Sequence, residues 1–169
     1  AILLCAAGGA GDLFESALCR SHTLTPSRQG FNHVFPTIDE MKGMVKDPVA
    51  YRYEHADGLA STMLLMNGLV QDFNFAARLE GRETPLSTQM YLPMPPSRAT
   101  LANFFSPQVN HVEAMILTGR PSYPLERTLL TTGLVVAGVD SLHRDQARVD
   151  TPHLDIAYQA TAESTFWRT

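Results

Sequence analysis

The chain has 169 residues, of which 44% are hydrophobic and 18% are charged, and its formal net charge at pH 7 is -4. These values describe a globular protein with a substantial core and exclude a disordered chain. The mild acidity, with Lys42 and Lys46 as the only lysines and no basic cluster, argues against binding to nucleic acid.

The two cysteines, Cys5 and Cys19, make neither a disulfide framework nor a C-x-x-C pair, which indicates thiols in a reducing compartment. No apolar run approaches the roughly 20 residues that span a bilayer, and the N-terminal run lacks the basic flank of a signal peptide. We therefore expect a cytoplasmic location without membrane contact. Because the first residue is not Met, we also expect a further segment upstream.

The chain opens with AILLCAAGGAGDLFESAL, in which an apolar run precedes Gly8, Gly9 and Gly11. This order of parts begins dinucleotide-binding folds, whose fingerprint is G-x-G-x-x-G. Counting from Gly9, Phe14 occupies the third glycine position, and no acid ends a strand roughly 20 residues later. The stretch is better explained as a helix with Asp12 as its N-cap, and we place no cofactor site there.

Residues 1–47 are predicted to form a helical lead-in, whose second helix begins with the capping box of Thr37 and Glu40 and ends near Val45. From residue 48 the pattern alternates with period two, which is typical of strands.

Four strands are predicted over 48–93. The turn at Asp57-Gly58 joins the first two strands, and Asn67-Gly68 predicts a second hairpin turn. The third and fourth strands then cover 73–79 and 86–91. We therefore predict an antiparallel meander.

Residues 106–143 are predicted to form two helices. The first has Ser106 as its N-cap and Pro107 as its first residue, and it ends at Gly119. The second covers about 124–143 with a middle that is apolar nearly all round. Residues 147–158 predict a terminal edge strand.

Strands followed by helices are typical of an α+β domain, with a mostly antiparallel, open-faced sheet and helices packed on one face. We predict a single domain over 1–169. If Phe73, Phe75 and Leu79 face the helices, the open face is polar and contacts solvent, a partner subunit or a hydroxylated ligand. This polar face would carry Asp72, Asn74, Arg78, Ser87, Gln89 and Tyr91.

The stretch VNHVEAMILTGRPSYPLERTLLTTGLVVAGVDSLHRDQARVDTP combines a helix ending at Gly119, a proline-containing link, a long helix with Ala137 and Ser141, a charged turn and a strand starting at Arg148. In order and spacing it resembles the C-terminal half of the glucose-fructose oxidoreductase, inositol dehydrogenase and rhizopine-catabolism (Gfo/Idh/MocA) family. The segment from VAYRYEHADGLASTMLLMNG through STQMYLP looks like the sheet of that family, so the resemblance covers most of residues 12–158.

The resemblance implies a C-terminal domain that helps to form a sugar or polyol pocket in an NAD- or NADP-dependent oxidoreductase and that uses its sheet in a homo-oligomer. The family's nucleotide fingerprint, its Glu-Lys-Pro segment with the catalytic lysine and its Asp-x-x-x-His pair do not occur in this sequence. We therefore expect no cofactor on this chain, name no catalytic residue and expect no hydride transfer by it alone. The alternative is a stand-alone α+β dimerisation or small-ligand-binding module without redox activity.

Candidate substrate contacts combine the polar face of the sheet with the start of the two helices. His111 with Glu113 makes no metal site, because residues two apart on a helix point to different sides and no other ligand joins them. His111 is either a hydrogen-bonded, partly buried side chain or a sugar contact. Arg127 either pairs locally or, with Tyr123, binds a ligand carboxylate or hydroxyl. The full set is Arg78, Gln89, Tyr91, His111, Tyr123 and Arg127.

Overall fold

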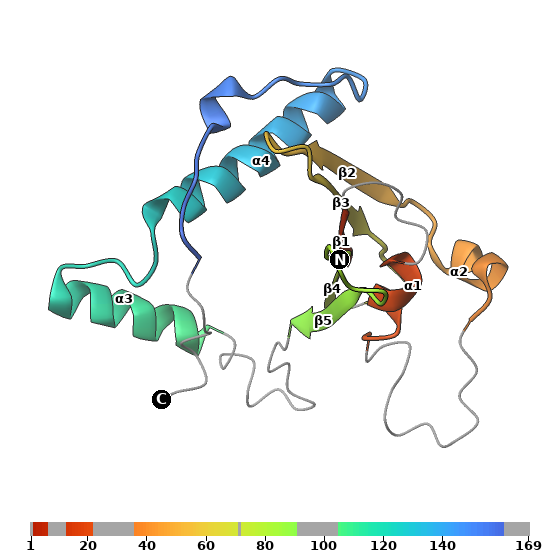
Figure 1. Ribbon diagram of the computed structural model, residues 1–169, viewed down its shortest axis with the longest axis horizontal. Coiled ribbons are helices and arrows are strands. Elements are labelled where there is room, and N and C mark those ends of the chain that lie inside the picture. Colours follow the sequence, from red (N-terminus) through yellow and green to blue (C-terminus); the bar gives the residue numbers. More distant parts are fainter. Residues whose placement is uncertain (1, 7–12, 22–35, 71, 91–104, 161–169) are drawn as a thin grey trace. The chain divides into compact units, whose positions relative to one another are not determined.

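A computed structural model describes residues 2–6, 13–21, 36–70, 72–90 and 105–160. The chain divides into two compact units, Ala1–Leu92 and Pro93–Thr169. The first unit holds a sheet and two short helices, and the second holds two longer helices and a 3₁₀ turn (Figure 1). This content confirms the predicted α+β class, while the single domain remains a prediction.

The first unit is built on one five-stranded sheet with the strand order β2-β3-β1-β4-β5. Strand β1 pairs antiparallel with β3 and parallel with β4, and the β2–β3 and β4–β5 pairs are antiparallel. The sheet is therefore mostly antiparallel, as predicted. The strands are β1 (Ile2–Ala6), β2 (Val49–Glu54), β3 (Ala60–Leu65), β4 (Phe73–Ala77) and β5 (Leu86–Met90).

The hairpin between β2 and β3 forms where Asp57-Gly58 predicts it. The Leu59 N–H donates to Asp57 Oδ1 at 3.0 Å, and the His55 N–H donates to the Leu59 carbonyl at 2.8 Å. Gly58 has a φ of 86°, which glycine adopts at little cost. The turn is thus determined by residues within five positions of one another.

The meander predicted for 48–93 is wrong in one pairing. Asn67-Gly68 does turn the chain, but β3 and β4 do not pair, because β1 lies between them. Ile2 has Leu64 opposite it on one side and Asn74 on the other. An apolar segment is most stable in a central position, where neighbouring strands satisfy its backbone on both edges. The lead-in 1–47 is therefore not wholly helical.

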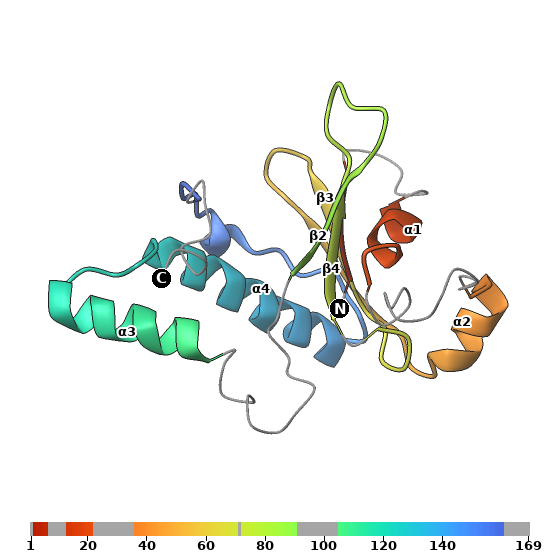
Figure 2. The same ribbon diagram turned by 90° about the horizontal axis from the view of Figure 1, so that it is seen from below.

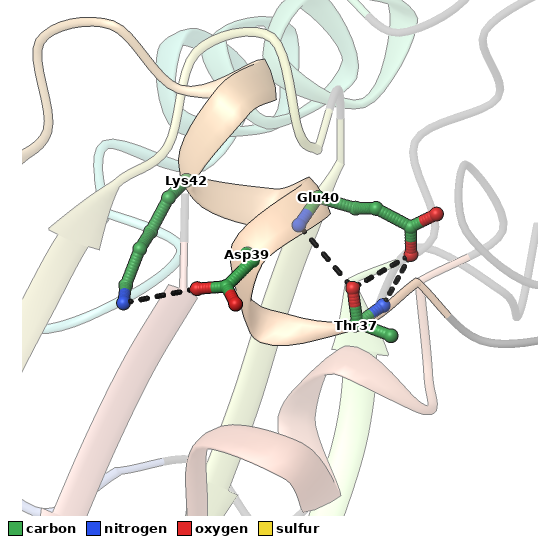
Figure 3. A network of polar contacts seen from close by, with 4 residues as sticks. All are labelled: Thr37, Asp39, Glu40 and Lys42. Carbon is green, nitrogen blue, oxygen red and sulfur yellow. Dashed lines mark hydrogen bonds and ion pairs between the residues drawn. The ribbon is translucent and has the colours of Figure 1, made fainter.

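Two short helices, α1 (Leu13–Leu18) and α2 (Ile38–Met44), lie on the same side of the sheet (Figure 2). The Asp12 cap predicted for α1 falls outside the described residues. The capping box of α2 is confirmed: the Thr37 N–H and Oγ1 donate to Glu40 Oε2 at 2.7 and 2.8 Å, and the Glu40 N–H donates back to Thr37 Oγ1 at 3.3 Å (Figure 3). The helix ends at Val45, as predicted.

The core lies between these helices and the sheet. Apolar side chains of β1 and β4 meet α1, and residues from the end of α2 and from the turn before β4 complete the cluster. Its buried members are Ile2, Leu4, Leu13, Ala17, Leu18, Met41, Val45, Leu69, Val70 and Ala76.

The predicted orientation of β4 is wrong. Asp72 and Asn74 are each 3% exposed, whereas Phe73 is 45% exposed. The register places Asn74 beside Ile2, and the buried side chain of Ile2 belongs to the core under α1. Alternation along one strand separates its two faces, but the neighbouring strand decides which face is covered.

The opposite face of the sheet, which we call the outer face, is largely apolar. Val49, Phe73 and Leu86 are each at least a third exposed on it. The second face of an antiparallel sheet ordinarily carries polar side chains toward water, so the composition of the outer face departs from the usual one. Its larger members are Val49, Tyr51, Tyr53, Met63, Leu65, Phe73, Phe75 and Leu86.

The second unit confirms the two helices predicted over 106–143, α3 (Ser106–Thr118) and α4 (Leu125–His143). The N-cap of α3 is Phe105 rather than Ser106, so the predicted start was one residue late. Gly119 ends α3 with a φ of 67°, and its N–H donates to the Met115 carbonyl at 2.8 Å.

The terminal strand predicted for 147–158 does not form. This segment folds back along α4 and contains the 3₁₀ turn η2 (Pro152–Leu154) (Figure 1). The Leu154 side chain lies against Gly133 of α4, and Ser141 Oγ donates to the Ala147 carbonyl at 2.7 Å. Residues 105–160 offer no strand for it to pair with, and a proline lacks the N–H that a ladder needs.

Candidate functional site

A buried polar cluster lies where the end of α1 meets β4 and β5. We call Ser21, Asp72, Asn74 and Gln89 the Asp72 cluster. Ser21 Oγ donates to Asp72 Oδ1 at 3.1 Å and to Oδ2 at 2.9 Å. Asn74 Nδ2 donates to Asp72 Oδ1 at 2.5 Å, and Gln89 Nε2 donates to Oδ2 at 2.9 Å. Four contacts from three neutral side chains therefore converge on one carboxyl group.

Local structure explains why these four side chains meet. The Ser21 N–H donates to the Leu18 carbonyl at 2.9 Å, which continues the turn beyond α1. Asp72 directly precedes β4, and Asn74 and Gln89 are partners in the β4–β5 register. Partners in an antiparallel pair point to the same face of a sheet. The two amides thus point to the same side as Asp72.

The cluster has one polar atom without a partner. The Oδ1 atom of Asn74 is buried and accepts no hydrogen bond in the structure. A buried acceptor left unpaired costs free energy, and such atoms in native proteins call for an explanation. Because the oxygens of Asp72 already accept these contacts, a ligand group that matches the cluster is a hydrogen-bond donor to Asn74 Oδ1, such as a hydroxyl group.

A more exposed contact continues this polar region toward the surface. Arg20 Nε donates to Ser87 Oγ at 3.0 Å, and Ser87 lies on β5 opposite Ala76. Of the predicted contacts in the first unit, Gln89 belongs to the Asp72 cluster, whereas Arg78 is an exposed residue just beyond β4. Tyr91 lies outside the described residues.

In the second unit, the predicted residues gather at the link between α3 and α4. The Arg127 guanidinium lies over the Tyr123 ring, 4.9 Å from its centroid. Ser122 Oγ donates to the His111 carbonyl at 3.4 Å, which brings α3 to this link. A guanidinium held on an aromatic face keeps its N–H groups directed outward in a plane. The sequence predicted a local pair for Arg127 or a shared ligand contact with Tyr123; in the structure the two side chains make a cation–π contact with each other, and the ligand contact stays a prediction.

Two ionisable groups outside these clusters have shifted pKa values. Hydrogen bonds from the backbone and side chain of Thr37 lower the pKa of Glu40. Burial on the outer face raises the pKa of Tyr53, and the neighbouring Tyr51 adds to that rise. Neither group lies at the Asp72 cluster.

Two negative findings hold for the part of the chain that the structure describes. No three side chains among its His, Cys, Asp and Glu are placed to hold a metal ion together. None of its helices combines the length and the apolar character that crossing a membrane requires.

Sequence reasoning identified Gln89 but missed the rest of the Asp72 cluster as a site. The signal was the alternation of Asp72 and Asn74 with Phe73 and Phe75, whose polar side was assigned to the open face. Ser21 carried no local signal, because its contact to Asp72 spans 51 residues. No family model, curated protein or solved structure matches the chain.

Proposed function

We propose that this chain is the substrate-pocket and oligomerisation domain of an NAD(P)-dependent sugar or polyol oxidoreductase, and that it is not catalytic by itself. The observation that carries the proposal is the outer face, an apolar sheet surface with exposed Val49, Phe73 and Leu86 on a unit whose core lies on the other side. Such a surface is stable when it is buried against protein. A second copy of the chain supplies that protein in this proposal.

The substrate part of the proposal rests on two polar groups, the Asn74 side-chain amide and the Arg127 guanidinium. The unpaired Asn74 Oδ1 accepts a hydroxyl, and the planar donors of Arg127 suit hydroxyl or carboxylate oxygens. Polyols present both donors and acceptors, so they match either group. The cofactor, NAD or NADP, is assigned to a part of the enzyme other than this chain.

Sedimentation equilibrium of the wild type and of Phe73→Lys tests the oligomer. The wild type is expected to show a concentration-dependent mass above 18.6 kDa, and the variant a mass that stays near the monomer through the same range. Ile38→Lys is the matched control, because Ile38 is also exposed but lies on α2. A wild type that stays monomeric at high concentration contradicts this part of the proposal.

Titration of the isotope-labelled chain with myo-inositol and with glucose tests the substrate class. The Asn74 side-chain amide or the Arg127 Nε–H signal is expected to shift with saturation. Arg127→Ala lacks the Nε–H and is expected to leave a shift of the Asn74 amide unchanged, because Asn74 belongs to the other unit. Absence of saturable shifts at both groups would exclude a polyol contact on this chain.

The coding sequence upstream of Ala1 separates the oxidoreductase from the stand-alone module. The proposal expects a strand followed by G-x-G-x-x-G and, later, a Glu-Lys-Pro segment. A stop codon and a native start immediately before Ala1 would favour the module without redox activity.

A further inference from the structure

The exposed turn after β3 contains an asparagine followed by a glycine, Asn67 and Gly68. Asn67 is the only asparagine of the chain that directly precedes a glycine. Among the residues that the structure describes, neither the Asn67 side-chain amide nor the Gly68 N–H makes a hydrogen bond. Gly68 also has no side chain that would shield its nitrogen. The amide carbon of Asn67 and the nitrogen of Gly68 are therefore both free to react with each other.

The turn between β2 and β3 has a similar residue pair in the opposite state. Asp57 also precedes a glycine, but its Oδ1 accepts the Leu59 N–H at 3.0 Å. The Gly58 N–H donates to the His55 carbonyl at 2.9 Å. A hydrogen-bonded N–H must be released by local opening before it can lose its proton. The Asp57 turn is therefore protected by contacts that the Asn67 turn lacks.

We propose that Asn67 is a site of spontaneous covalent modification, at which its side-chain amide is converted to aspartate and isoaspartate. The Gly68 nitrogen loses its proton to base and attacks Asn67 Cγ. A bond forms between this nitrogen and Cγ, the bond from Cγ to Nδ2 breaks, and ammonia leaves. Water then opens the resulting five-membered cyclic imide. Hydrolysis at Cγ gives aspartate, and hydrolysis at the main-chain carbonyl gives isoaspartate, in which the main chain runs through Cγ.

The isoaspartate product lengthens the main chain where it is closely packed, because it adds a CH₂ group to the backbone. A Cβ at Gly68 would already overlap the Met44 carbonyl oxygen. Leu69 and Val70, which follow, are 1% and 6% exposed and belong to the core. Their N–H groups both donate to the Met66 carbonyl, at 3.1 and 3.2 Å. Because the core is close-packed, a longer turn is expected to weaken these bonds and the packing of both side chains.

Peptide mapping by mass spectrometry, after incubation of the full chain at mildly alkaline pH, tests the site. The peptide with Asn67 is expected to gain the mass of an amide-to-acid conversion at least about 10-fold faster than the peptide with Asn110. Asn110 is the internal control, because it is exposed but lies inside α3, which must open before its N–H groups can react. Asn67→Gln keeps an amide but would need a six-membered ring, so it is expected to stay unmodified. Equal rates at Asn67 and Asn110, or conversion of Asn67→Gln as fast as the wild type, would overturn the proposal.

The variant Asn67→Asp isolates the contribution of the two turns. In this variant both turns contain aspartate followed by glycine, so they differ only in their hydrogen bonds. Isoaspartate is expected to accumulate at position 67 at least about 10-fold faster than at Asp57, because the Asp57 turn must first open. Equal accumulation at both positions would contradict the protective role of the hydrogen bonds.

Hydrogen exchange separates the effect of the longer backbone from that of the new charge. Chains with isoaspartate at position 67, isolated by ion exchange, are compared with freshly prepared Asn67→Asp. The N–H groups of Leu69 and Val70 are expected to exchange at least about 10-fold faster in the isoaspartate form. Fresh Asn67→Asp is expected to match the wild type, because a substitution at an exposed position has little effect on packing. Equal protection in both forms would contradict the predicted loss of packing.

Discussion

Ser21 Oγ donates to both carboxylate oxygens of Asp72, at 3.1 and 2.9 Å, across 51 residues of sequence. This contact joins the end of α1 to the start of β4, and Gln89 extends it to β5. A buried carboxyl group that accepts hydrogen bonds from three segments holds these segments together as long as all of the hydrogen bonds are made. The Asp72 cluster is therefore the candidate site, and it also stabilises the packing of α1 against β4 and β5.

Loss of the carboxyl group is expected to destabilise the first unit. Asp72→Ala leaves the buried donors of Ser21 and Asn74 without this acceptor, and each unsatisfied buried group costs about 1–3 kcal/mol. Urea unfolding followed by circular dichroism should show a loss of at least about 2 kcal/mol on that scale. Arg20→Ala, which removes only an exposed contact to Ser87, should change stability by less than about 1 kcal/mol. Equal effects of the two variants would contradict the role of the cluster.

Gly68 is expected to tolerate a side chain far less well than Gly81. Both residues have positive φ, 94° and 75°, so alanine is strained at either position. At Gly68 a Cβ would also overlap the Met44 carbonyl oxygen, whereas nothing lies near a Cβ at Gly81. Thermal unfolding of Gly68→Ala and Gly81→Ala should therefore give a clearly larger drop in Tm for the first. Similar drops would show that the turn does not pack against the end of α2.

The Thr37 side chain is expected to cause part of the lowering of the Glu40 pKa. The Thr37 backbone N–H bond is the largest cause of the lowered pKa and the side-chain bond the second. Thr37→Ala removes only the second, so the pKa of Glu40 should rise part of the way toward its ordinary value of 4.5. Carbon-13 NMR of the Glu40 carboxyl group during a pH titration measures this. Ile38→Ala serves as the control and should leave the titration unchanged.

The sign of this shift also sets a pH window. A carboxyl group whose pKa is lowered in the folded state stabilises that state above its ordinary pKa, and the contribution is lost as pH falls through the folded value. Protection of α2 amides against hydrogen exchange should therefore weaken below about pH 4.5, and this loss should be smaller in Thr37→Ala. An identical pH dependence in both proteins would contradict the capping box.

Gly133 and Leu154 are expected to show strong coupling. In the wild type, Gly133→Ala gains about 1 kcal/mol of helix propensity but forces the Leu154 side chain away from α4. In a Leu154→Ala background, the same change should show the propensity gain alone. A double-mutant cycle by thermal unfolding, with hydrogen exchange at the Leu154 N–H as local readout, measures the difference. Additive effects would mean that η2 does not rest on α4.

The elements that the sequence predicts well are those specified by neighbouring residues. Thr37 and Glu40 lie three positions apart, and Asp57 with Gly58 forms the turn between β2 and β3. Gly119 ends α3 through its own backbone conformation. In each case the determining hydrogen bond closes within one turn of chain, so its residues are adjacent in the sequence.

The elements that the sequence predicts poorly depend on distant pairing. The position of β1 between β3 and β4 reverses the face that Asp72 and Asn74 occupy, and no local pattern encodes it. Ser21 lies 51 residues before Asp72, so no local pattern connects it to the site. Tyr123 and Arg127 are only four positions apart, so their proximity could be read from the sequence, although their cation–π contact was not predicted.

The central claim, that the outer face of the sheet associates with a second copy of this chain, is tested most directly by NMR on a mixed sample. One half of the sample carries labelled methyl groups, including Val49, Leu65 and Leu86, and the other half carries protonated Phe73 and Phe75 in a deuterated background. The proposal predicts intermolecular contacts between these methyl groups and phenylalanine rings, which vanish in Phe73→Lys. A dimer without such contacts, or a monomer at every concentration, would contradict it.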